Sequence, residues 1–225
     1  MGGITEISEK RIATLYGKIL LLLLLISSSL NSCKSADEEN VPYYNDANFT
    51  PFWAPTVEDK ANLHKIGAFS FTNQYGREVS NQNFKGKVYL ASFFFTSCPS
   101  ICPKLTNTMK MVFDNFKGNK NVLFLSHSVT PDIDSVSRLY DYAKENQILS
   151  KQWHLVTGDK SEIYNIARKG YFIEQETGLT KLSGQFLHTE NFVLIDADGH
   201  IRGIYNGTLE AEVPRIIEDI NFLIR

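Results

Sequence analysis

A hydrophobic run that ends abruptly in two cysteines constrains this chain more than any other stretch. Residues 88–95 are almost entirely apolar, and two residues later the chain continues as Cys98-Pro99-Ser100-Ile101-Cys102-Pro103. An apolar run of this length without polar alternation is typical of a strand that is buried on both faces. The stretch therefore predicts a buried strand that leads directly into a turn carrying two thiols.

Pro103 indicates how this turn ends. Proline disfavours helical angles in the residue before it and is well suited to the first position of a helix. Apolar residues then recur at helical spacing, at Leu105, Met109, Val112, Phe113 and Phe116. We expect an irregular turn from Cys98 to Cys102 and a helix that begins at Pro103. Both thiols then lie near a helix N-terminus, where the partial positive charge favours the thiolate form.

The spacing of the cysteines leaves three kinds of site open. Thioredoxin-type oxidoreductases usually have two residues between their cysteines, whereas this chain has three. Three residues still allow a disulfide, and they also let two sulfurs converge on one ion. Two thiolates do not complete a structural zinc site, but they suit Cu(I), and a histidine would let the same site hold Cu(II). A purely structural disulfide is least favoured, because so short a loop gains little from closure.

Five histidines are candidates for a third ligand. We expect His127 at the end of a strand, on the same sheet edge as the cysteines, which makes it the second choice. His188 precedes a strand near the C-terminus, and in a thioredoxin-like fold the loop entering that strand lies beside the cysteine turn. His188 is therefore the first choice. His64 and His200 are expected to be solvated, and His154 is expected to be a packing residue.

The order of the predicted elements indicates an α/β domain. Strands are expected over residues 67–76 (as a hairpin), 88–95, 121–126, 153–157, 192–196 and 200–205. Helices are expected over residues 103–117, 134–144, 161–167 (capped by Asp159 or Ser161) and 211–224. This alternation predicts a thioredoxin-like fold, with a mixed central sheet, helices on both faces and an N-terminal hairpin extension.

The N-terminus has the layout of an export signal. A basic flank precedes the apolar block 19–26, which is too short to favour a spanning helix. The residues that follow, Leu30-Asn31-Ser32-Cys33, resemble a bacterial lipobox, although Asn31 is unusual there. We expect residues 1–33 to be a lipoprotein-type signal that ends at a lipidated Cys33; the alternative is an uncleaved N-terminal anchor. Either way, the domain is held at a membrane and faces outside the cytoplasm.

Composition sets the domain boundaries and excludes one class of partner. Residues 34–54 are polar, acidic and without any period, so we expect a flexible tether with no regular structure, docked onto the domain by Phe52 and Trp53. The globular domain then covers residues 55–225. The net charge of −2 and the lack of a basic stripe argue against nucleic acid as a partner.

The stretch from Phe93 to Pro103 resembles the signature of the Sco/SenC family, the membrane-tethered copper chaperones of cytochrome oxidase assembly. The similarity extends over residues 66–225 and includes the hairpin, the segment 153–158, and a histidine followed by the segment 192–199. The resemblance implies a thioredoxin-like fold and a copper site made by Cys98, Cys102 and His188. One difference is Thr130-Pro131-Asp132, where the family often has Asp-Pro; Asp132 and Asp134 keep acidic groups nearby.

Two functional hypotheses follow, from different classes. The first is a metallochaperone rather than an enzyme, which carries Cu(I) or Cu(II) on the periplasmic side of the cell envelope and passes it to the copper centre of a terminal oxidase subunit. Copper binding needs reduced thiols, so we expect a thiol reductant protein as a second partner, and a Cys98–Cys102 disulfide as an off state.

The second hypothesis is a thiol:disulfide reductase that keeps a partner's metal-binding cysteines reduced without needing His188. A thiol peroxidase is a weaker third, since no specific signature supports it.

Overall fold

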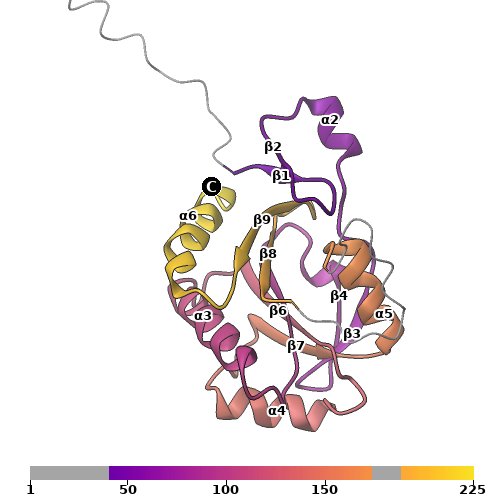
Figure 1. The fold of residues 1–225 in the computed structure, drawn as a ribbon, viewed down its shortest axis with the longest axis vertical. Coiled ribbons are helices and arrows are strands. Elements are labelled where there is room, and N and C mark those ends of the chain that lie inside the picture. Colours follow the sequence, from indigo (N-terminus) through magenta and orange to yellow (C-terminus); the bar gives the residue numbers. More distant parts are fainter. Residues whose placement is uncertain (1–40, 174–188) are drawn as a thin grey trace, which may run out of the picture. The chain divides into compact units, whose positions relative to one another are not determined.

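The computed structural model describes residues 41–173 and 189–225 (Figure 1). The chain divides into two units, Met1–Glu38 and Glu39–Arg225, and all described residues belong to the second. Cys33 and His188, both singled out from the sequence, lie outside the described residues. Within the described ranges, no helix is long and apolar enough to cross a membrane.

The described strands form one mixed sheet with the order β2-β1-β9-β8-β5-β6-β7-β3-β4. Strands β5, β6 and β7 run parallel, while β8 is antiparallel to β5 and forms a hairpin with β9. Because parallel strands share one carboxyl edge, the segments that follow β5 and β6 emerge side by side. The strand bounds are β1 Tyr43–Tyr44, β2 Pro51–Phe52, β3 Ser70–Asn73, β4 Glu78–Ser80, β5 Val88–Phe94, β6 Val122–Ser128, β7 Trp153–Thr157, β8 Asn191–Ile195 and β9 Ile201–Asn206.

Helices cover both faces of this sheet. Figure 1 shows α3 and α6 side by side on one flank and α5 on the other. The helix bounds are α2 Val57–Asn62, α3 Ile101–Asn115, α4 Val136–Glu145, α5 Lys160–Asn165, the π-helical turn η2 Ile166–Gly170, and α6 Val213–Leu223, with short 3-10 turns at Asn81–Asn83 and Glu210–Glu212. The predicted thioredoxin-like class, with a mixed sheet between helices, is confirmed.

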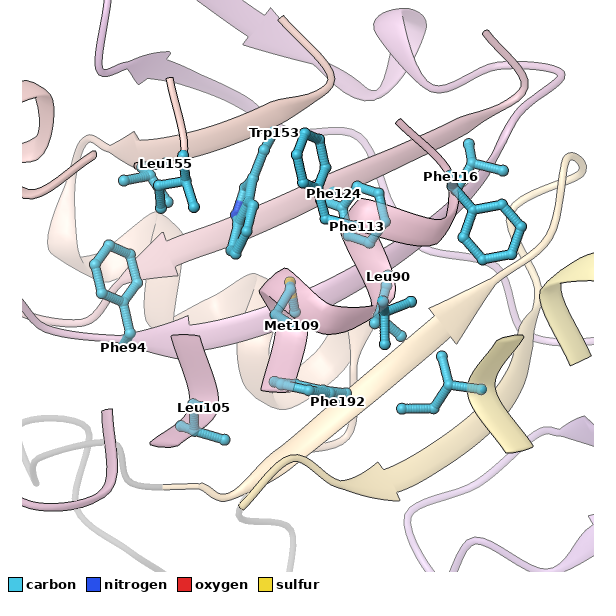
Figure 2. Close-up of a cluster of buried hydrophobic side chains, with 14 of the residues drawn as sticks. Leu90, Phe94, Leu105, Met109, Phe113, Phe116, Phe124, Trp153, Leu155 and Phe192 are labelled. Atoms are coloured by element: carbon cyan, nitrogen blue, oxygen red, sulfur yellow. The ribbon is translucent and has the colours of Figure 1, made fainter. Parts of the chain in front are cut away.

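The core consists of two apolar clusters, one on each face of the sheet. Figure 2 shows the cluster under α3, where Leu105, Met109 and Phe113 pack against strand residues such as Leu90 and Phe124. The neighbouring strand residues point the other way and form the second cluster under α5 and η2. This division follows from the pleat, since successive side chains of a strand point to opposite faces. All seven residues of β5 are buried, as the apolar run predicts.

Turn chemistry explains the hairpins. In the turn between β3 and β4, Gly76 has a φ of 70°, and in the turn between β8 and β9, Gly199 has a φ of 91°. Glycine adopts positive φ without the steric penalty that a side chain brings. Asp159, one of the two predicted caps of α5, accepts a hydrogen bond from the N–H of Glu162 at 3.0 Å. Both predicted hairpins and this cap are confirmed.

The expectation that residues 34–54 lack regular structure is wrong for the part that the structure describes. Tyr44 of β1 pairs with Ile201 of β9, so this segment adds strands to the edge of the central sheet. The docking residues also differ from the predicted ones: Phe52 and Trp53 are 40% and 54% exposed, whereas Val41 and Tyr43 are buried.

A buried arginine explains why this segment is ordered. Arg202 of β9 donates from Nη2 to the carbonyl oxygen of Val41 at 2.6 Å and from Nε to that of Pro42 at 3.0 Å. Its guanidinium lies 3.7 Å from the centre of the Tyr43 ring and makes an ion pair with Asp196 at 3.1 Å. These partners satisfy the donors of a buried charge, which is otherwise costly. Such long-range contacts leave no periodic pattern in the segment itself.

Candidate metal centre

Cys98 and Cys102 lie on the turn that joins β5 to α3, at the carboxyl edge of the parallel strands. Both carry free thiols; Cys102 is buried and Cys98 is partly exposed. The N–H of Cys102 points to the sulfur of Cys98 at 3.4 Å, and the N–H of Cys98 donates to the carbonyl oxygen of Phe95 at 3.3 Å. The turn therefore brings both thiols to one edge of the sheet, where open α/β sheets place their ligands.

Helix α3 begins at Ile101, two residues earlier than the sequence predicts. Pro103 is its third residue, and the first N–H groups of a helix have no partner within the helix, so proline loses no hydrogen bond at this position. Ser100 precedes the helix without a side-chain cap bond. The sulfur of Cys98 accepts a hydrogen bond from the N–H of the second helical residue, Cys102, and so takes the role that the Ser100 side chain leaves open.

The environment of Cys98 favours its ionised form. Burial raises the pKa of the Cys98 thiol, but the N–H groups of Cys102, Ser100 and Ile101 and the thiol of Cys102 lower it by more, so that its pKa lies below the ordinary value. Donors directed at a sulfur stabilise the thiolate, the form that attacks disulfides and binds metals. Cys98 is therefore the more reactive thiol of the two.

Cys102 has the opposite character. Burial raises the pKa of its thiol to about 12, and although the N–H of Phe95 opposes this shift, the thiol of Cys98 and the carboxylate of Asp134 add to it. A metal that binds here must displace the proton of Cys102, because the thiolate is the ligand. Metal binding by this pair is therefore coupled to proton release.

A buried carboxylate lies behind the cysteine turn. Asp134 has no exposed surface. It accepts hydrogen bonds from the hydroxyls of Thr96 at 2.6 Å, Ser128 at 2.6 Å and Thr130 at 3.1 Å, and from the N–H of Thr96 at 3.2 Å. The hydroxyl of Thr96 in turn accepts from Nε of Arg138 at 3.1 Å. The hydroxyl of Thr130, where the sequence comparison expected an acidic residue, thus donates to Asp134 four positions later.

From the sequence, Asp134 is predicted as the start of a helix and as an acidic residue near this loop, but not as part of the site; the helix in fact begins at Val136. The network was missed because its members are far apart in the sequence: Thr96 and Asp134 are separated by 38 positions. The signal that could have found it was the hydroxyl-rich end of each strand, since Thr96 follows β5, Ser128 is the last residue of β6 and Thr130 comes two residues later.

His127, the second-choice ligand, lies on the wrong face of the sheet. In the parallel register of β5 and β6, Phe93 is opposite His127. Phe93 belongs to the cluster under α5, whereas its neighbour Phe94 packs with Cys102 in the cluster under α3. The His127 ring stacks on Phe93 with 5.0 Å between ring centres. Its side chain is therefore turned away from the cysteines.

The His127 ring is completely buried, and neither of its nitrogens has a hydrogen-bond partner among the described residues. Phe69, Phe71 and Tyr171 complete the aromatic surroundings that Phe93 begins. Burial lowers the pKa of His127 to about 3. The imidazole is therefore neutral at physiological pH, and it belongs to the core rather than to a polar site.

The expectation of a solvated side chain is wrong for His200, whereas His64 is only partly buried. His200 is buried, and its Nδ1 lies 3.0 Å from the carbonyl oxygen of His64. Nε2 of His64 lies 2.7 Å from the carbonyl oxygen of Gly170. His154 is a packing residue, as expected: its Nδ1 lies 3.2 Å from Nδ2 of Asn73, and burial, followed by the charge of Lys87, lowers its pKa to about 4.

The first-choice ligand, His188, lies outside the described residues, but the residue after it does not. Thr189 lines a small cavity together with Cys102, Ile101 and Phe95. The chain entering β8 therefore passes directly beside the buried cysteine. Among residues 41–173 and 189–225, no group of three histidine, cysteine, aspartate or glutamate side chains converges to hold a metal ion.

Comparison with known proteins finds a matching family and a similar relative. A family model described as SCO1/SenC matches residues 57–225. The SCO1 protein homolog of Bacillus subtilis is 32% identical over 168 residues, which cover 73% of this chain and 84% of the relative.

Two solved structures are similar over most of the domain. BsSco, described as a member of the Sco family of cytochrome c oxidase assembly proteins with a disulfide switch, is 33% identical with a TM-score of 0.60, over 70% of this chain and 92% of that one. ScoI of Bradyrhizobium japonicum, solved with copper bound, is 25% identical with a TM-score of 0.54, over 68% and 96% of the two chains. The chain therefore belongs to the SCO1/SenC family.

Proposed function

We propose that this protein is a membrane-tethered metallochaperone that binds copper and delivers it to the copper centre of a terminal cytochrome c oxidase. The observation that carries the proposal is the pair of free thiols on one turn, with the N–H of Cys102 directed at the Cys98 sulfur. Thiolates suit a soft ion such as Cu(I). Membership of the SCO1/SenC family, which includes a relative with bound copper, supports copper as the cargo.

We assign the third ligand to His188. The position of Thr189 beside Cys102 supports this assignment, because the histidine directly precedes Thr189 in the chain. An imidazole would let the site accept Cu(II) as well as Cu(I). A three-ligand site also suits transfer, since an incoming thiolate of the oxidase subunit can bind before the old ligands leave.

The proposed cellular location is the periplasmic side of the envelope, with a lipid on Cys33. Arg202 fixes the chain at Val41, so seven residues separate the proposed lipid from the domain. Even fully extended, a chain of this length reaches only about 27 Å. The domain is then held close to the membrane that carries the lipid. Cys33→Ala is expected to release the protein from the membrane fraction; retention there would favour an uncleaved anchor instead.

Anaerobic titration of the reduced full-length chain with Cu(I) tests the proposal. We expect one copper ion per chain, and we expect Cys98→Ser and Cys102→Ser each to abolish tight binding, because one thiolate alone makes a weak site. Titration at several pH values should also show proton release, given the raised pKa of Cys102. Tight binding that survives loss of either cysteine would contradict the copper assignment.

The thiol:disulfide reductase remains a second candidate, favoured by the unequal thiols. A partly exposed Cys98 with a lowered pKa suits attack on a partner disulfide, and a buried Cys102 with a raised pKa suits the resolving role. The reductase transfers two electrons: its dithiol becomes a disulfide while the partner's disulfide becomes a dithiol. Reduction of an oxidised copper-centre peptide with turnover, combined with weak copper binding, would favour this function over the chaperone.

A further inference from the structure

We propose that Asp134 is a positioning residue of the copper site, which holds the cysteine turn in its binding geometry through Thr96. The proposal rests on the proposed copper function for its ligand. It also makes a prediction about the thiol pair that does not need copper.

The side chain of Asp134 is hydrogen-bonded to two segments, the one that leads into the cysteine turn and the neighbouring one at the end of β6. Its carboxylate takes two hydrogen bonds from Thr96, which follows β5, and two from the hydroxyls of Ser128 and Thr130, at the end of β6. The carboxylate therefore joins the two neighbouring strand ends at the edge where the cysteines lie. A buried carboxylate is tolerated only when its oxygens are hydrogen-bonded in this way.

Thr96 transmits this restraint to both cysteines. It lies two residues before Cys98, and its own N–H is one of the groups held by Asp134. The residue before it, Phe95, accepts the N–H of Cys98 through its carbonyl oxygen and directs its own N–H at the Cys102 sulfur. A shift of Thr96 would therefore displace the backbone that positions both sulfurs. Arg138 restrains the same hydroxyl from α4.

Two sulfurs must converge on one ion, so a small displacement of the turn weakens both bonds to the metal. Each hydrogen bond to a charged group contributes enough for its loss to change an affinity by about tenfold. We therefore expect Asp134→Asn, in which an amide group faces the donors, to weaken Cu(I) binding about tenfold. Thr96→Val, which keeps the carboxylate but removes the hydroxyl, should weaken it by a similar factor.

The chain offers matched controls. Asp132 lies in the same loop with a side chain that is 75% exposed, so Asp132→Asn removes the same charge without touching the network. Thr96→Ser keeps the hydroxyl and should restore binding to within about twofold of the wild type. In the double variant Asp134→Asn with Thr96→Val, the two losses should not add, because both break one path.

The test measures Cu(I) affinity by competition with a chelator, and the dithiol–disulfide equilibrium in glutathione buffers, for full-length chains whose folded fraction is checked by circular dichroism. We expect both constants to change about tenfold in Asp134→Asn and Thr96→Val, and to stay within about twofold in the controls. For the thiol pair, a tenfold change corresponds to about 30 mV.

Unchanged constants with reduced stability would overturn the proposal in favour of a structural role. Tighter copper binding in Asp134→Asn would overturn it in favour of a charge effect. If the wild type binds no copper, the proposed function fails, while the thiol equilibrium still decides the role of Asp134.

Discussion

Two neighbouring residues of β6, His127 and Ser128, are both completely buried, but they face opposite sides of the sheet and differ in their hydrogen bonding. Ser128 faces the cysteine edge, where its hydroxyl donates to Asp134 at 2.6 Å. His127 faces the opposite cluster, where aromatic rings surround it and neither ring nitrogen finds a partner among the described residues. The pleat of a single strand thus separates a satisfied polar group from an unsatisfied one.

The difference shows what each face of the sheet does. On the cysteine side, buried polar groups cost little because they are paired, and the pairing organises the turn that carries the thiols. On the far side, the buried imidazole stays neutral and has no hydrogen-bond partner within the described part of the chain, which costs stability. Changes on the cysteine side should therefore alter the thiol site as well as stability. Changes around His127 should alter stability alone.

The largest expected effect is loss of the satisfied network. Asp134→Ala leaves the N–H and hydroxyl of Thr96 and two further hydroxyls without their acceptor. We expect the free energy of unfolding to fall by about 3 kcal/mol, as measured by urea denaturation at pH 7. Asp132→Ala, in the same loop but exposed, should change it by less than about 0.5 kcal/mol. Equal losses in the two variants would mean that the paired groups at the cysteine edge contribute no stability of their own.

Acidification should expose the cost of His127. Its folded pKa of about 3 lies below the value of 6.5 for a free histidine, so between these values the unfolded state binds a proton that the folded state does not. The contribution of His127 to stability is therefore constant above pH 6.5 and falls as the pH drops below it, by about 1.4 kcal/mol per pH unit. His154 adds a smaller effect of the same sign. In His127→Leu, urea denaturation at pH 5 and pH 7 should differ less than in the wild type, and an unaltered difference would show that His127 is not the source.

At pH 7, His127→Leu should stabilise the protein slightly, whereas Asp134→Ala should destabilise it. Leucine has a similar volume to histidine and needs no hydrogen-bond partner, so His127→Leu is expected to raise the free energy of unfolding by about 1 kcal/mol. Thermal or urea denaturation measures this gain. A loss of more than about 1 kcal/mol would mean that the ring nitrogens make an interaction that leucine cannot replace.

The sequence was sufficient to predict the part of the fold that depends on local pattern. The apolar run of residues 88–95 became β5, and the glycines at 76 and 199 lie in the turns they predicted, because period and turn chemistry are local properties. The cysteine pair was also located at a strand end beside a helix start. The exact start of α3 was missed, because Pro103 is tolerated anywhere in the first helical turn.

The remainder depends on contacts between distant residues. Nothing near Val41 indicates that Arg202 will hold it, and nothing near His200 indicates that this buried ring will pack against Tyr43, with 5.6 Å between ring centres. The hydrogen bonds of Asp134 reach back 38 positions to Thr96. Alternation along β6 places His127 on the face away from the cysteines, but the register that decides this comes from pairing with β5. Such features follow from the assembled sheet, not from any one segment.

The two candidate histidines provide the most direct test of the central claim, that copper is held by Cys98, Cys102 and His188. Cu(I) affinity should be measured by chelator competition on His188→Ala and His127→Leu under identical reducing conditions. We predict at least tenfold weaker binding in His188→Ala and an unchanged affinity in His127→Leu. Unchanged affinity in His188→Ala, or a comparable loss in His127→Leu, would contradict the assignment of the site.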